Sequence, residues 1–86
     1  MKHAPVADLT RIIQQISRGS DFGPRFHGVI VEPADDGLGG EFLRVSLRFD
    51  KTRDLTWETV KPLVTAIEDA VLEIDERFPS VRFPDP

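Results

Sequence analysis

Residues 41–49 alternate between two sets of side chains, and this alternation constrains the fold more than any other feature of the chain. One set is Leu43, Val45, Leu47 and Phe49, and the intervening set is Phe42, Arg44, Ser46 and Arg48. Because successive side chains of a strand point to opposite faces of its sheet, the pattern predicts a β-strand with one face on a hydrophobic core. The rest of the chain must supply the elements that cover this face.

Residues 6–17 carry apolar side chains at intervals of three and four, which is the spacing of an amphipathic helix. Pro5 suits the first helical turn, where its missing N–H costs nothing. Arg18 favours the negative end of the helix dipole, and Gly19 can take the conformation that ends a helix. These signals predict a first helix over residues 6–17.

Residues 57–78 show the same spacing over a longer stretch, with Thr56 or Asp54 as the N-cap and a proline directly after the last residue. Pro62 lies inside the pattern, so we expect a kink there or a helix that starts near Lys61. The side opposite the apolar stripe is acidic and is predicted to be solvated: Glu68, Asp69, Glu73, Asp75 and Glu76. Glu73 and Arg77 stand at the four-residue spacing that favours an ion pair on a helix.

Two further strands are expected. Residues 25–32 predict a strand that is apolar on both sides, and residues 33–40 are dense in turn formers that join it to the strand over residues 41–49. Residues 81–83 predict a short last strand, which Pro84 confines to an edge or a strand end.

The resulting order is α-β-β-α-β, in a single α+β domain over residues 1–86. A right-handed crossover through the long helix makes the second and third strands parallel. Both helices then cover one face of a small three-stranded sheet. The expected fold is a two-layer sandwich of the ferredoxin-like or metallochaperone-like type.

The bulk properties limit the function classes. A chain of 86 residues buries only roughly 60–65% of the surface that its unfolded form exposes, so self-association would help to stabilise it. The chain has no cysteine, which excludes disulfides and thiolate metal sites. Its net charge of −4 argues against nucleic-acid binding. No apolar run could span a bilayer and no secretory signal is visible, so we expect a cytoplasmic protein without membrane insertion.

The sequence predicts no enzyme, no cofactor and no metal site. His3 lies near the chain start and His27 in the first strand, with no second ligand near either in sequence. The acidic side of the long helix carries no signal of the burial that a tuned acid–base pair needs. The glycine-rich run at residues 37–40 lacks the lysine and the following helix of a phosphate-binding loop.

The sheet face away from the helices is the best candidate for a binding surface. If Leu43 and its alternates pack on the helices, Phe42, Arg44 and Arg48 line the outside. Either Phe26 and Ile30 or Val29 and Val31 should join them, because the first strand is apolar on both sides. Such a face predicts a subunit or partner interface with apolar anchors and an arginine rim. The interface residues predicted are Phe26, Val29, Val31, Phe42, Arg44, Arg48 and, off the main stripe of the long helix, Leu72.

Several segments resemble the cytoplasmic C-terminal domain of cation diffusion facilitator transporters. They are residues 42–47 (FLRVSL), 55–58 (LTWE), 67–71 (IEDAV) and 77–79 (RFP), with the closing Asp85–Pro86. The resemblance spans roughly residues 9–86 and includes the α-β-β-α-β order. It implies a metallochaperone-like fold and a homodimer.

The same resemblance implies regulatory binding of divalent metals. At the positions of the family's metal ligands, this sequence has a possible ligand at His27 and at Asp85. At the other ligand positions, Ser46, a residue near Lys61 and Phe83, it has side chains that are not good ligands. Divalent transition metals usually take about four protein ligands, so most of the set is missing.

The function expected from the sequence is a small, non-catalytic, homodimeric module for assembly or partner binding. The alternative is a divalent-metal-responsive regulatory domain similar to those of cation efflux transporters, with most ligands replaced.

Overall fold

The computed structural model describes residues 2–50 and 55–84 of the chain. Its elements follow the predicted α-β-β-α-β order, with one short 3₁₀ turn added before the first strand. They are α1 (Val6–Arg18), η1 (Gly23–Arg25), β1 (Phe26–Asp35), β2 (Glu41–Phe49), α2 (Trp57–Leu72) and β3 (Pro79–Arg82). None of the helices in the described ranges is long and apolar enough to cross a membrane.

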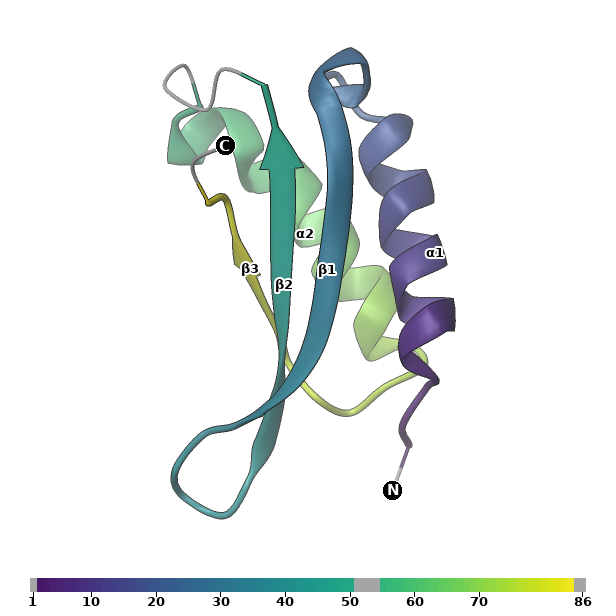
Figure 1. The fold of residues 1–86 in the computed structure, drawn as a ribbon, viewed down its shortest axis with the longest axis vertical. Coiled ribbons are helices and arrows are strands. Elements are labelled where there is room, and N and C mark those ends of the chain that lie inside the picture. Colours follow the sequence, from purple (N-terminus) through teal and green to yellow (C-terminus); the bar gives the residue numbers. More distant parts are fainter. Residues whose placement is uncertain (1, 51–54, 85–86) are drawn as a thin grey trace.

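The sheet is mixed and has the strand order β1-β2-β3. β1 and β2 form an antiparallel hairpin, and β3 pairs parallel to β2 after the crossover through α2. Figure 1 shows α2 crossing behind the strands and α1 alongside β1 at the edge of the sheet, while none of the described helices lies in front of the strands. The α+β class, the α-β-β-α-β order of the elements along the chain and the parallel direction of β2 and β3 are therefore confirmed, whereas the ferredoxin-like assignment stays a prediction.

The core lies between the sheet and the two helices. The alternation in β2 is confirmed, because Leu43, Val45 and Leu47 are fully buried and Phe49 almost so. The helices contribute a matching set of buried side chains: Leu9, Ile13, Val60, Leu63, Val64, Ile67 and Val71. Phe49 also meets the rings of Phe22, Phe26 and Phe83, so an aromatic cluster closes this end of the core.

The first helix and the first strand run longer than the sequence predicts. α1 ends at Arg18 instead of residue 17, and β1 continues through Pro33 to Asp35. Pro33 is tolerated because β1 is an edge strand, where a residue without an N–H need not break the ladder. The turn itself is held by Asp36, whose carboxylate accepts hydrogen bonds from the N–H groups of Leu38 and Gly40.

α2 begins where predicted but ends six residues early, so the predicted helix over residues 57–78 is wrong at its C-terminal end. Thr56 caps the helix through its side-chain oxygen, which accepts from the Thr59 N–H at 3.3 Å. The helix is continuous through Pro62, so the alternative start near Lys61 is also wrong. Pro62 has no N–H, so the carbonyl of Glu58, four residues earlier, lacks its helical hydrogen-bond donor. Glu58 is exposed, and water can donate to this carbonyl instead.

A buried ion pair occupies the place of the expected last helical turns. Asp75 is fully buried and Arg77 is 8% exposed. The Arg77 guanidinium donates to both Asp75 carboxylate oxygens, from Nε at 2.9 Å and from an Nη at 2.7 Å. The Arg77 N–H donates to the same carboxylate at 2.9 Å, which fixes a tight turn. The prediction that Asp75 lies on a solvated helix face is therefore wrong. The predicted pair between Glu73 and Arg77 is also wrong, because Arg77 pairs with Asp75.

The N-terminal segment docks onto this turn. The Ala4 N–H donates to the Asp75 carboxylate at 2.9 Å, and the Lys2 carbonyl accepts from the Glu76 N–H at 2.8 Å. Lys2 Nζ in turn donates to the Glu73 carbonyl at 2.6 Å. Hydrogen bonds from Arg77 and from the Ala4 N–H hold the pKa of Asp75 far below its usual range. The pair therefore connects the end of α2, the start of β3 and the N-terminus.

We expect Asp75→Asn to lower the free energy of unfolding by about 3 kcal/mol at pH 7, because it leaves the buried Arg77 guanidinium with only the exposed Glu41, at 3.6 Å, as a counter-charge. The folded-state pKa of Asp75 is depressed, so its contribution is present above the unfolded value of about 4 and is lost as the pH falls. The difference between wild type and variant in urea denaturation should thus shrink between pH 4 and pH 2. The exposed Asp69→Asn is the control, and an equal loss in both variants would contradict the role of the pair.

Gly23 lies against the end of α1. A Cβ atom at residue 23 would stand 2.1 Å from the Arg18 carbonyl oxygen, whereas one at Gly28 would meet nothing within 4 Å. We expect Gly23→Ala to cost about 1–3 kcal/mol, since backbone must move to relieve the clash. Gly28→Ala should change stability by less than about 0.5 kcal/mol. Thermal denaturation of both variants tests the assignment, and equal melting temperatures would refute it.

Candidate functional site

The sheet has one uncovered side, whose residues follow from the register. In β1 and β2, Gly28 stands opposite Arg48, Ile30 opposite Ser46, Glu32 opposite Arg44 and Ala34 opposite Phe42. In β3, Ser80 stands beside Arg44 and Arg82 beside Ser46. We call this surface the outer sheet face; it comprises Gly28, Ile30, Glu32, Ala34, Phe42, Arg44, Ser46, Arg48, Ser80 and Arg82.

The structure places Phe42, Arg44 and Arg48 on the outer sheet face, as the sequence predicts. Phe42 and Arg44 are half-buried and Arg48 is exposed. The Arg44 guanidinium carbon lies 6.0 Å from the centre of the Phe42 ring, within the range of a cation–π contact. The Nε atom of Arg44 is buried and has no hydrogen-bond partner among the described residues.

The predicted orientation of Phe26, Val29 and Val31 is wrong. Val31 is only 6% exposed and belongs to the core, and Phe26 and Val29 pack against it. Val29 and Val31 pair with the buried Leu47 and Val45, and cross-strand partners share a face. These three residues therefore point toward the helices.

A register irregularity between Phe26 and Gly28 explains the error for Phe26. Phe26 pairs with Phe49, but Gly28 already pairs with Arg48, so one extra residue stands in β1 at His27. Such a bulge shifts the alternation by one position. Phe26 and Ile30 consequently lie on opposite faces of the sheet. The sequence predicts the same face for both, because they are four positions apart and a regular strand alternates every residue. Ile30 is left as the exposed apolar residue of β1, at 50% exposure.

Three arginines surround Ser46 at the centre of the outer sheet face. Arg44 and Arg48 stand two positions before and after it in β2, and Arg82 is its neighbour in β3. Within residues 2–50 and 55–84, none of the three forms an ion pair. Arg82 is not among the residues that the sequence predicts for this face, because its position depends on the pairing of β3 with β2.

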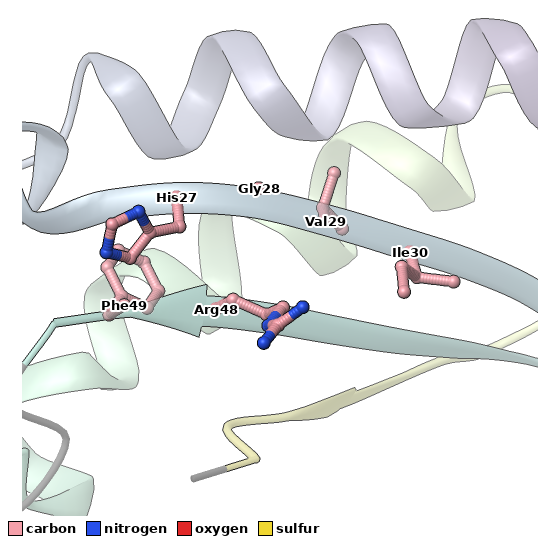
Figure 2. Close-up of a pocket in the computed structure, with 6 residues that line it drawn as sticks. All are labelled: His27, Gly28, Val29, Ile30, Arg48 and Phe49. Carbon is pink, nitrogen blue, oxygen red and sulfur yellow. The ribbon is translucent and has the colours of Figure 1, made fainter. Parts of the chain in front are cut away.

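A shallow pocket of about 450 Å³ lies at one end of this face and is lined by His27, Gly28, Val29, Ile30, Arg48 and Phe49 (Figure 2). His27 is exposed, and its Nε2 lies 2.5 Å from an Asp50 carboxylate oxygen. The pocket lining contains no hydroxyl, thiol or amine that this histidine could activate as a nucleophile. The His27–Asp50 pair thus contributes charge and hydrogen-bonding groups beside the apolar Ile30.

The described residues do not form the metal site that the family resemblance implies. They contain no group of three or more histidine or acidic side chains that could hold an ion. His27 has one acidic neighbour, Asp50, which makes two ligands where about four are usual. Asp85, the other ligand position of the resemblance, lies outside the described residues. His3 lies in the N-terminal segment and contacts Glu76, 3.2 Å from its Nε2.

Leu72 does not belong to the outer sheet face. It lies in the last turn of α2 and is 44% exposed. Trp57, in the first turn of the same helix, is 62% exposed, although the sequence pattern placed it in the buried stripe. α2 thus carries exposed apolar side chains of its own, at both ends of the helix.

Comparison of the chain with protein-family models, with curated proteins and with solved structures found no match. The resemblance to cation efflux domains therefore stays a prediction.

We expect titration with Zn²⁺, Mn²⁺ or Ni²⁺ in a calorimeter to give no saturable heat, since His27 and Asp50 supply only two ligands. His27→Ala should leave the titration unchanged. One-to-one binding that disappears in His27→Ala would contradict this expectation and favour the metal-responsive alternative.

Proposed function

We propose that this protein is a non-catalytic assembly module that associates with further copies of itself through the outer sheet face. The observation that carries the proposal is the composition of that face. A sheet side open to water is usually polar, but here Ile30 is half-exposed and Phe42 and Ala34 stand together at one end.

The size of the chain supports the proposal independently. A domain of 86 residues without cysteine has a small core and no covalent link to reinforce it. The molecule measures 36 × 24 × 20 Å, and its broad side is the sheet face seen in Figure 1. That side is large enough for a standard interface, which buries roughly 800 Å² on each partner.

The absence of a catalytic role is part of the proposal. Of three surface pockets in the described part of the chain, none combines a histidine with a hydroxyl group. The third pocket is lined by His3, Glu41 and Arg77, among others. These charged side chains already have partners: His3 contacts Glu76, and Glu41 contacts Arg77 of the buried ion pair. Metal-responsive regulation is the alternative, and its support is the sequence resemblance together with the His27–Asp50 pair.

We expect the wild-type protein to associate at micromolar concentration and Ile30→Glu to remain monomeric, because the substitution places a charge at the centre of the proposed contact. Leu38→Glu is the matched control: Leu38 is 91% exposed in the hairpin turn, outside the outer sheet face, and the change in net charge is the same. Sedimentation velocity over a dilution series measures the masses. A wild type that is monomeric at 100 µM, or an equal effect of both substitutions, would refute the proposal.

A further inference from the structure

We infer that copies of this protein associate head to tail, with the outer sheet face of one copy resting on the exposed side of α2 of the next. The inference rests on the proposed self-association and adds which surface meets the outer sheet face. It is carried by the opposite charges of the two surfaces and by the apolar residues that each of them exposes.

The outer sheet face is basic although the chain as a whole is acidic. It carries Arg44, Arg48 and Arg82, with Glu32 as its only acidic residue, while the net charge of the chain is −4. No described residue forms an ion pair with any of these four side chains. The acidic surplus of the protein must therefore lie elsewhere on its surface.

Part of this surplus lies on the side of α2 that faces away from the core. At 100° per residue, seven side chains fall within one third of the helix circumference, opposite Val60, Leu63 and Ile67. They are Trp57, Glu58, Lys61, Thr65, Glu68, Asp69 and Leu72. Three of them are acidic and one is basic, and within the described residues none of the four forms an ion pair.

The apolar residues of the two surfaces also match. Trp57 and Leu72 are 62% and 44% exposed at the two ends of α2, and the outer sheet face offers the half-exposed Ile30 and the half-buried Phe42. The 16 residues of α2 span about 24 Å and the nine residues of β2 about 30 Å, so the helix fits along the strand. An interface of this kind would have apolar contacts flanked by arginine–carboxylate pairs.

A two-fold symmetric contact would bring like charges together. Two outer sheet faces would oppose the three arginines of each copy, with only one glutamate per copy to compensate them. Two α2 surfaces would oppose the acidic residues in the same way. Like charges across an interface cost free energy and suppress a pairing, whereas the head-to-tail contact joins opposite charges. Such a contact leaves one free surface at each end, so it builds rings or open chains beyond the dimer.

Two charge-reversal variants test this arrangement. Arg48→Glu/Arg82→Glu inactivates the sheet side and leaves α2 intact, whereas Glu68→Lys/Asp69→Lys inactivates α2 and leaves the sheet side intact. All four positions lie on the solvent side of their elements, so folding, checked by circular dichroism, should be retained. We expect each variant alone to associate at least tenfold more weakly than wild type in sedimentation equilibrium. An equimolar mixture should associate again, because the intact α2 of the first variant can meet the intact sheet face of the second, and the two reversed surfaces are also opposite in charge.

Arg48→Glu as a single substitution should also weaken association. Arg11→Glu on α1 makes the same change in net charge outside both surfaces, and it should associate like wild type. Wild-type association should also weaken as salt is raised from 50 to 500 mM, since the charged contacts are screened. If the α2 variant dimerises like wild type while Ile30→Glu is monomeric, the proposed function stands and the head-to-tail contact is refuted. A mixture that stays monomeric also refutes it. A monomeric wild type would overturn both.

Discussion

The ion pair between Asp75 and Arg77 determines how the second half of the chain is arranged. Its carboxylate accepts from the Arg77 backbone and side chain, and this turn replaces the helical hydrogen bonds that would continue α2. The chain thereby reverses and delivers residues 79–82 to β2, where Leu43 donates to the Phe78 carbonyl just before the parallel pairing begins. The outer sheet face depends on the same turn, because the turn places Arg82 beside Ser46.

Much of the architecture could be predicted from periodicity. The two-residue alternation in β2 and the helical spacing in α1 and α2 identified the elements, and the crossover rule gave the parallel pairing of β3. These features are local, or depend on neighbouring elements, so the sequence contains them. The positions of Phe42, Arg44 and Arg48 on the outer sheet face followed from the same alternation once the core side of β2 was known.

The errors occurred where tertiary contacts override local pattern. The apolar spacing continues to Phe78, but burial of Asp75 against Arg77 and Ala4 ends the helix at Leu72. The extra residue at His27 turns Phe26 inward, where it meets the ring of Phe49, and no local signal marks that bulge except Gly28 next to it. The arginine cluster around Ser46 combines two strands that are far apart in sequence, so it becomes visible only in the folded sheet.

The docking of the N-terminus has a consequence for biosynthesis. Lys2 and Ala4 bond to Glu73, Asp75 and Arg77, which follow them by 71 to 73 positions in the chain. A ribosome releases the first helix and the hairpin long before these partners leave its exit tunnel. The core therefore closes only after residues 73–77 have also left the tunnel, and until then the apolar stripe of α1 and the core side of the hairpin lack α2 as a cover. During that interval the nascent chain presents surfaces that chaperones recognise.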